Sequence, residues 1–307
     1  MTDTAAPVLR SSGDLIADRR LGYAEGLIGD GDLDAAAELL TQILERVPGW
    51  SMAWFKLGEV EASRGAPGTA ADAFARALTL DPDDELGAGL HLARLGAAAA
   101  PASAPAAYIR SLFDQYAGRF ETHLVEKLAY RGPQLLRSAL RGLSDGPFAH
   151  AIDLGCGTGL AGAAFRAVAQ RLTGIDLAPK MVAAAATKNI YDRLEVAAIE
   201  AFLASEPPAS ADLLVAADSL SYIGELAPVI EAAQQVLRPG GLFAMTLQRG
   251  EAAVTLGADL RFAHAPDYLS DCAAAQGLAV RRLEEAALRR DRDADVAALV
   301  AVLEKPW

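Results

Sequence analysis

Cysteine is scarce in this chain of 307 residues, which contains only Cys156 and Cys272. Two cysteines cannot form a disulfide framework. Neither lies in a Cys-x-x-Cys pair or near a group of histidines that would indicate a zinc site. We therefore expect reduced thiols in a cytoplasmic protein that binds no metal.

Long apolar runs are also missing. No stretch of 18 uncharged apolar residues occurs, so no membrane-spanning helix is expected. Residues 1–14 lack the apolar stretch after basic residues that marks an export signal, and we expect them to form a flexible N-terminus. With 52% hydrophobic residues, the chain has the length and composition of about two globular domains.

Basic residues are too few to balance the acidic ones. The chain has 28 Lys and Arg against 40 Asp and Glu, a net charge of −12. Nucleic acid and anionic membranes attract basic surfaces, so neither is an expected partner. The first 100 residues hold 16 acidic and 8 basic side chains, a net charge of −8, which favours a basic protein partner if this part binds one.

A 34-residue repeat is the first feature that the chain does contain. With Ser51 as position 1, large residues occupy positions 4, 7 and 24, small ones positions 8, 20 and 27, and a proline position 32. These residues are Trp54, Leu57, Phe74, Gly58, Ala70, Ala77 and Pro82. Small residues let two antiparallel helices approach closely, large ones fill the groove, and the proline ends the second helix. The segment resembles tetratricopeptide repeats.

A weaker copy lies 34 residues earlier, and one further helix is expected over residues 85–95. The matching residues of the copy are Tyr23, Ala24, Ala36, Leu40, Ile43 and Pro48. We expect a helical repeat domain at 15–96 and an Ala- and Pro-rich linker at 97–107. The resemblance implies a surface for protein partners; the alternative for so short an array is a cap or a dimerisation element.

From residue 148 onward, short apolar strands alternate with helical stretches, which is typical of a doubly wound, mostly parallel α/β sheet. The first strand, 148–154, runs into the glycine-rich turn GCGTG and then a helix expected to reach Gln170. The second strand ends at Asp176. Further strands are expected near 194–198, 211–217 and 240–248, and further helices at 178–189 and 226–237.

The turn after the first strand is a candidate site for a nucleoside-bearing cofactor. Glycines leave backbone N–H groups and the start of a helix open to a ligand. Asp176 ends the next strand 21 residues after Gly155, where its carboxylate can hold both ribose hydroxyls. Gly157, Gly159 and Gly162 also match the Gly-x-Gly-x-x-Gly pattern of dinucleotide-binding proteins, which by itself does not decide the cofactor.

Four motifs in order resemble those of class I methyltransferases, which use S-adenosylmethionine: AIDLGCGTG, GIDLAPKMVAAA, LLVAADSLSYIGEL and VLRPGGLFAMTL. The resemblance implies that Asp153 closes the first strand, that the glycine turn packs on the methionine part of the cofactor, and that Asp176 binds the ribose. It also implies that Met181 covers the adenine and that Asp218 lies beside the methionine part and the substrate.

The cofactor-binding residues that these motifs imply are Asp153, Gly155, Cys156, Gly157, Gly159, Asp176, Leu177, Met181, Asp218 and Ser219. Cys156 is expected to be a small buried side chain against the cofactor rather than a reactive thiol. Many relatives also carry an acidic residue after the third strand that binds the adenine amino group. The matching position here is Ala198, so backbone groups of Ala198 and Ile199 would hold adenine instead, with Glu200 as a substitute.

The end of the chain favours this family over dinucleotide dehydrogenases. After a helix expected at 266–276, two strand-like stretches, 278–290 and 296–304, are joined by the polar turn DRDAD. We expect an antiparallel hairpin at the end of the sheet, as in class I methyltransferases. The charges of RRLEEAALRR, residues 281–290, are expected to form one solvated face.

Two further segments, YIRSLFDQYAGRFETHLVEKLAYRGPQLL and RFAHAPDYL, resemble a bacterial group of methyltransferases that carry an N-terminal tetratricopeptide array. The resemblance implies a methyltransferase domain at 108–307, with a helical lid over the cofactor at 108–140 and a core at 147–307. Tyr116 or Arg131 of the lid would pair with the cofactor carboxylate. Arg131, followed by Gly and Pro at a helix end, is the better ligand candidate.

Catalytic residues are harder to derive. Methyl transfer from a sulfonium is an in-line displacement, so the enzyme must mainly align the acceptor with the methyl group. His264 follows the fifth strand, where substrate loops cluster, and is a candidate general base or substrate ligand; the alternative is a structural histidine. Asp218 is the second candidate catalytic residue.

The sequence thus predicts an S-adenosylmethionine-dependent methyltransferase, with S-adenosylhomocysteine as product, that acts on a small molecule or on an acceptor presented by a partner protein. Its repeats would serve protein interaction or dimerisation. Two alternatives remain: a repeat-based interaction protein whose methyltransferase fold is catalytically silent, and an NAD-dependent oxidoreductase.

Overall fold

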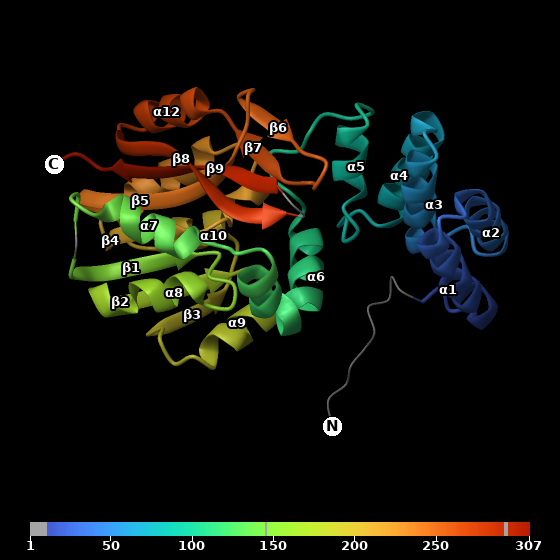
Figure 1. Cartoon of the computed structure of the whole chain (residues 1–307), viewed down its shortest axis with the longest axis horizontal. Coiled ribbons are helices and arrows are strands. Elements are labelled where there is room, and N and C mark those ends of the chain that lie inside the picture. Colours follow the sequence, from blue (N-terminus) through green and yellow to red (C-terminus); the bar gives the residue numbers. More distant parts are fainter. Residues whose placement is uncertain (1–10, 145, 292–293) are drawn as a thin grey trace. The chain divides into compact units, whose positions relative to one another are not determined.

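The computed structural model describes residues 11–144, 146–291 and 294–307, with the side chain of Asp291 left out. The chain divides into two compact units between Pro101 and Ala102, inside the stretch expected as a linker (Figure 1). The flexible N-terminus expected at 1–14 falls mostly on residues 1–10, which lie outside the described residues.

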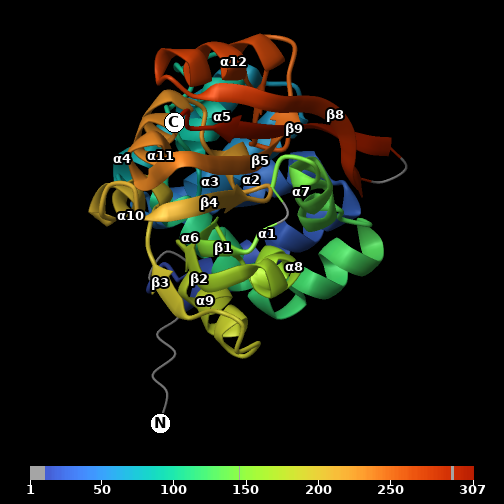
Figure 2. The ribbon, with the colours of Figure 1, turned by 90° about the vertical axis from the view of Figure 1, so that its left-hand side faces the viewer.

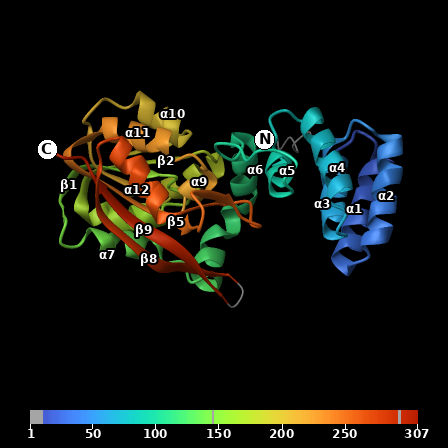
Figure 3. The same cartoon turned by 90° about the horizontal axis from the view of Figure 1, so that it is seen from above.

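Among the described residues, the first unit consists of two antiparallel helix pairs, α1 with α2 and α3 with α4, followed by the single helix α5, as the repeat pattern predicts (Figure 3). They are α1 (Leu15–Asp30), α2 (Leu33–Arg46), α3 (Ser51–Ser63), α4 (Pro67–Leu80) and α5 (Ala88–Arg94). The predicted helical tetratricopeptide region is therefore confirmed. Of the large residues at the repeat positions, Phe74 and Leu40 are fully buried, whereas Tyr23 is 64% exposed.

Local chemistry explains where these helices begin, end and touch. The Asp14 carboxylate accepts hydrogen bonds from the N–H groups of Ile16 and Ala17 and caps α1, and Gly31 ends that helix with φ at +80°. Gly58 lets α3 lie against α4, because a Cβ at this position would come within 2.7 Å of the Phe74 ring. The small residue of the repeat pattern is thus a condition of helix packing.

The second unit is built on a nine-stranded sheet among the described residues. The strands are β1 (Phe148–Leu154), β2 (Ala169–Asp176), β3 (Arg193–Val196), β4 (Ala211–Ala216), β5 (Leu237–Arg249), β6 (Val254–Leu256), β7 (Phe262–His264), β8 (Ala279–Asp291) and β9 (Ala294–Glu304). Strands β3, β2, β1, β4 and β5 pair in parallel in that order, and β9 pairs antiparallel with β5 and β8. The predicted hairpin and doubly wound sheet are confirmed.

Helices cover both faces of this sheet (Figure 2). One face packs against α10 (Ile199–Ser205), α11 (Ala227–Val236) and α12 (Pro266–Ala275), and the other against α7 (Gly132–Leu140) and α8 (Leu160–Phe165). The remaining helical segments are α6 (Ala106–Tyr116), α9 (Pro179–Ala186) and the short turns η2 (Ala117–Arg119), η3 (Thr122–Lys127), η4 (Arg166–Val168) and η5 (Leu220–Tyr222). Because both faces are covered, the central strands are apolar almost throughout.

The structure differs from the sequence-based expectation in several elements. The helix after the glycine turn ends at Phe165 rather than Gln170, because Ala169 already pairs with Phe148 in the sheet. The short strands β6 and β7 and helix α10 were not expected. No helix in the described part of the chain has both the length and the apolar character needed to cross a bilayer.

Candidate functional site

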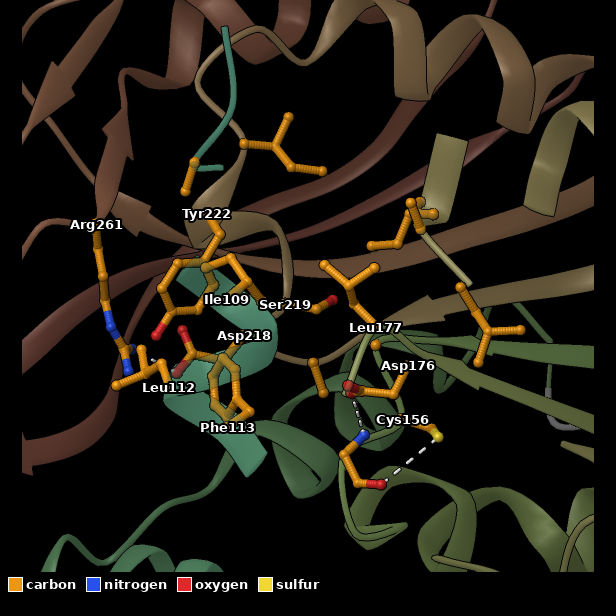
Figure 4. Close-up of a pocket in the computed structure, with 18 of the residues that line it drawn as sticks. Ile109, Leu112, Phe113, Cys156, Asp176, Leu177, Asp218, Ser219, Tyr222 and Arg261 are labelled. Carbon is orange, nitrogen blue, oxygen red and sulfur yellow. Dashed lines mark hydrogen bonds and ion pairs between the residues drawn. The ribbon is translucent and has the colours of Figure 1, made fainter. Parts of the chain in front are cut away.

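A cavity of about 420 Å³ lies at the carboxyl ends of β1, β2, β3 and β4, under the helical segment that precedes the core (Figure 4). This is where a doubly wound sheet offers its binding crevice. Its wall includes Asp176 at the end of β2 and residues that follow β1, β3 and β4, from Gly155, Ala197 and Ala217 onward. Residues of α6 and η3, together with Phe120, Leu128 and Tyr130, form the cover.

The glycine turn forms one wall of the cavity. Gly155, Gly157 and Gly159 have φ values of +72°, +53° and +92°, which other residues rarely adopt. At Gly155 a Cβ would lie 2.4 Å from the Cβ of Ser219, so the turn touches the loop after β4. Cys156 is buried, lines the cavity and donates its N–H to the Ile175 carbonyl at 2.7 Å. Burial raises the pKa of its thiol, so the group stays protonated.

Asp176 holds the glycine turn against the end of β2. Its Oδ2 accepts a hydrogen bond from the Gly157 N–H and its Oδ1 one from the Ala178 N–H, both at 2.9 Å. Burial raises the pKa of this carboxyl group, and the two backbone N–H groups oppose that effect. The carboxylate therefore faces the cavity from a fixed position, beside Leu177 on the same wall.

Asp153 lies beneath the turn and not on the cavity wall. It is 2% exposed, and its Oδ2 accepts a hydrogen bond from the Tyr191 hydroxyl at 2.7 Å. Burial raises the pKa of its carboxyl group to about 7, although the Tyr191 hydroxyl acts in the opposite direction. The Tyr191 side chain fills the space over Gly162 and Gly174. A Cβ at Gly162 would come within 2.1 Å of its hydroxyl oxygen, and a Cβ at Gly174 within 2.6 Å of its ring.

Asp218 stands at the other end of the cavity, in the left-handed region with φ of +65°. Its N–H is held by the Thr246 Oγ1 at 2.8 Å. Its Oδ2 accepts hydrogen bonds from Arg289 Nη1 at 2.7 Å and from Arg261 Nη1 at 3.1 Å. Its Oδ1 is buried without a hydrogen-bond partner among the described residues. Such strain and an unpaired oxygen are typical of functional positions.

Arg289 corrects the expectation of one solvated charged face along 281–290. It is 7% exposed and pairs with Asp218. The register of β8 against β9 shifts between Ala287 and Arg289, so the alternation of inward and outward side chains breaks and both Leu288 and Arg289 are buried. A bulge of this kind leaves no mark in the charge pattern.

Tyr116 and Arg131, the two candidates in the lid, differ in position. Tyr116 lines the cavity, and its hydroxyl hydrogen-bonds His123 Nδ1. Arg131 has an exposed side chain outside the cavity wall, and its backbone N–H donates to the Leu288 carbonyl at 2.9 Å. Tyr130 lines the cavity instead and donates its hydroxyl to the Ala217 carbonyl at 3.1 Å.

The segment after β3 forms another wall of the cavity, made of Ala197, Ala198, Ile199 and Glu200. The segment expected near the adenine therefore does face the cavity. Ser219 also lines it, and its hydroxyl donates to the Leu154 carbonyl at 2.6 Å. Met181 and Gly159 do not line it: Met181 is fully buried in α9, and Gly159 begins α8.

His264 does not line the cavity. It is fully buried in β7, where its Nε2 donates to the Gly224 carbonyl at 3.0 Å and its ring stacks on Tyr268. Burial lowers the pKa of this imidazole. These contacts fit the structural histidine named as the alternative, and the structure does not bring His264 to the cavity wall.

Sequence reasoning missed Arg261, Arg289 and Tyr222, which the structure brings to the same cavity. Arg261 lies in the segment RFAHAPDYL, three residues before the catalytic candidate His264. Its guanidinium lies over the Tyr222 ring at 5.2 Å from the centroid. The arginine close to His264 in the sequence is thus the signal that could have indicated Arg261 as a cavity residue.

Two family models match the chain. Residues 152–243 match a methyltransferase domain, and residues 24–85 match a tetratricopeptide repeat. The ubiquinone biosynthesis O-methyltransferase of Xanthomonas campestris pv. campestris (strain B100) is 35% identical over 115 residues, 36% of this chain and 48% of that protein. The chain therefore spans about half the length of the curated relatives it matches.

Two solved structures share the fold. One is the methyltransferase in a complex with the Haloferax volcanii Trm112 methyltransferase activator, with a TM-score of 0.52 and 19% identity over 64% of this chain and 98% of that one. The other is the Burkholderia thailandensis 1,6-didemethyltoxoflavin-N1-methyltransferase with bound S-adenosylhomocysteine, with a TM-score of 0.51 and 18% identity over 68% and 94%. The predicted resemblance is confirmed: a tetratricopeptide region precedes a domain of the class I methyltransferase fold.

Proposed function

We propose that the protein is an S-adenosylmethionine-dependent methyltransferase that acts on a small molecule or on an acceptor presented by a partner. One observation carries this proposal. Residues 155–157 of the glycine turn, tied to Asp176 through the Gly157 N–H, and the strained Asp218 line two ends of one cavity. The matched methyltransferase domain, at 152–243, contains all of these residues.

The residues present fit this cofactor. The positive φ values at Gly155 and Gly157 leave backbone without Cβ atoms on the cavity wall, and a Cβ at Gly157 would project toward Phe120, which also lines the cavity. Asp176 and Leu177 would hold the ribose, and Ala198 and Ile199 would hold the adenine. The residues that would hold the methionine part are Gly155, Cys156, Gly157, Asp218, Ser219 and Tyr116.

When bound, S-adenosylmethionine supplies a methyl group activated by a positively charged sulfur. The chain must then hold an acceptor in line and keep water away. Among the described residues, no histidine or lysine lines the cavity. Of the three carboxylates that line the cavity in the described part of the chain, Asp218 lies at the end away from Asp176 and Glu200. We propose that its unpaired Oδ1 orients the acceptor. Relatives named for O-methylation support an oxygen acceptor.

Asp176→Ala tests the binding site. The change removes the carboxylate that would accept hydrogen bonds from the two ribose hydroxyls. We expect the binding free energy of S-adenosylhomocysteine to weaken by about 1–3 kcal/mol in isothermal titration calorimetry. Asp271→Ala, at an exposed position on α12, is the control and should bind as the unaltered protein does. Equal affinity in all three proteins would mean that Asp176 does not face the ribose.

The alternatives are not favoured. A dinucleotide dehydrogenase does not account for the antiparallel β9 beside β5, which the methyltransferase fold does. A silent scaffold does not account for an intact glycine turn and acidic residues on the cavity wall. Titration with NADH alongside S-adenosylhomocysteine separates the oxidoreductase, which would bind NADH alone.

For the repeat unit we propose protein interaction, either with a partner or with a second copy of the chain, and for the whole protein a cytoplasmic location. Protein interaction is supported by the tetratricopeptide match and by the exposed side chains of Leu15, Ile16 and Tyr23 on α1. The cytoplasmic location is supported by the two free cysteines, which form no disulfide. Sedimentation of the unaltered protein and of Tyr23→Glu tests self-association. A dimer that dissociates in the variant supports it, and a monomer at all concentrations excludes it.

A further inference from the structure

Two arginines share one carboxylate at the Asp218 end of the cavity. Arg289 and Arg261 each place Nη1 within 3.1 Å of the same oxygen, Asp218 Oδ2. Both arginines line the cavity, and among the described residues neither guanidinium makes another hydrogen bond. Arginine stays charged in proteins, so the three groups together carry one excess positive charge and several free N–H donors.

Other charged groups do not cancel this excess on the cavity wall. Asp259 acts on Arg261 electrostatically, but it is exposed, lies outside the wall, and its Oδ1 accepts the Arg261 backbone N–H at 3.2 Å. The other carboxylates on the wall, Asp176 and Glu200, belong to the end of the cavity expected for the nucleoside. Arg119 adds positive charge outside the wall, over the Tyr116 ring at 5.7 Å.

Aromatic rings surround the cationic end. Phe113 meets Tyr222 edge to face with centroids 5.5 Å apart, and it meets Phe120 at 6.1 Å. Tyr116 contacts Phe120 at 5.4 Å. In Figure 4, Arg261, Asp218, Tyr222, Phe113 and Leu112 lie on one side, Asp176, Leu177 and Cys156 on the other, and Ser219 between them. A ligand here meets apolar walls and fixed cationic donors together.

We propose that the methyl acceptor is an apolar, preferably aromatic, carboxylic acid whose carboxylate is bound by the free N–H groups of Arg261 and Arg289. This inference rests on the proposed function. A guanidinium matches a carboxylate in geometry and charge, and it does so most strongly where water is excluded. Asp218 aligns the two arginines but neutralises only one of them, so an anionic ligand completes the charge balance of the site.

The carboxylate of the cofactor's methionine part offers the same chemistry. The effect of losing Arg261 distinguishes the two carboxylates. If Arg261 bound the cofactor carboxylate, its loss would weaken the binding of S-adenosylhomocysteine. If Arg261 binds the acceptor carboxylate, the affinity for S-adenosylhomocysteine stays unchanged. Binding measurements on the full chain separate them without an activity assay.

The test uses calorimetry on the full chain saturated with S-adenosylhomocysteine, with benzoate and the neutral isostere benzamide as probes. We expect benzoate to bind at least tenfold more tightly than benzamide. Arg261→Gln should weaken benzoate about tenfold while S-adenosylhomocysteine affinity stays within twofold, and Arg261→Lys should restore part of the loss. Arg110→Gln removes the same charge from an exposed residue outside the wall and should leave the binding of both ligands unchanged.

Equal binding of benzoate and benzamide by the unaltered protein, or binding of neither, would overturn the acceptor inference and leave the proposed function intact. So would an Arg261→Gln protein that loses S-adenosylhomocysteine affinity but keeps benzoate. Failure of the unaltered protein to bind S-adenosylhomocysteine would overturn the proposed function itself. The two benzoate arms on the unaltered protein decide the inference even if the variant does not fold.

Discussion

At the scale of single residues, Asp153 shows how burial governs a group that sequence motifs place near a cofactor. The carboxyl group is buried under the glycine turn, with the Tyr191 hydroxyl and the Asp176 carboxylate as its neighbours. Its folded-state pKa is about 7, against an ordinary value of 3.8. The folded protein therefore holds an extra proton on Asp153 between these two values.

The sign of the pH dependence follows from this shift. A raised folded-state pKa stabilises the fold at low pH, and this contribution is lost as the pH rises from about 4 through 7. Asp153→Asn keeps an acceptor for Tyr191 but cannot ionise. The unaltered protein should therefore lose about 2.5 kcal/mol of unfolding free energy between pH 5 and pH 8 that Asp153→Asn does not lose, as measured by urea denaturation at both pH values. Parallel stability curves for the two proteins would contradict this assignment.

At the scale of elements, the contact between α3 and α4 depends on a single missing side chain. Gly58→Ala places a Cβ within 2.7 Å of the Phe74 ring, and since that ring is fully buried it has little room to move. We expect a loss of about 1–3 kcal/mol in urea unfolding. Gly26→Ala, in α1 with no atom within 4 Å of the new Cβ, should instead stabilise the protein by about 0.5–1 kcal/mol. Equal effects of the two changes would refute close packing at Gly58.

Element patterns also show what sequence can and cannot predict. The glycine turn, Asp176 and Asp218 lie at the carboxyl ends of β1, β2 and β4, which are neighbours in the sheet. The ends of parallel strands meet at one edge, so local motifs suffice to bring these residues together. Arg289 reaches the same place through a bulge in β8, and Arg261 through the unexpected strand β7. Both depend on pairing between distant segments, which leaves no periodic signal. His264 is hidden for the same reason, since β7 buries it.

At the scale of the whole molecule, the two units have separate hydrophobic cores. In the repeat unit, His91 stacks on Phe74 at 4.6 Å and meets Phe55 edge on at 5.3 Å. Burial, with help from Arg94 and Lys56, lowers the pKa of this imidazole to about 4. A lowered folded-state pKa means that stability is present above about 6.5 and is lost as the pH falls toward 4.

Tryptophan fluorescence can follow the repeat unit alone, because Trp50 is buried there whereas Trp307 in the second unit is 96% exposed. From pH 6.5 to pH 5, the unit should lose about 2 kcal/mol of unfolding free energy through His91. His91→Phe keeps the ring packing and should remove that loss. The same pH dependence in variant and unaltered protein would show that other groups are responsible.

The central claim, a cofactor site between the Gly155 turn and Asp218, is tested most directly by calorimetric titration of the unaltered full chain with S-adenosylhomocysteine. We predict saturable binding of one ligand per chain in the micromolar range, with no heat from NADH at the same concentrations. Absence of binding at high micromolar S-adenosylhomocysteine would contradict the account.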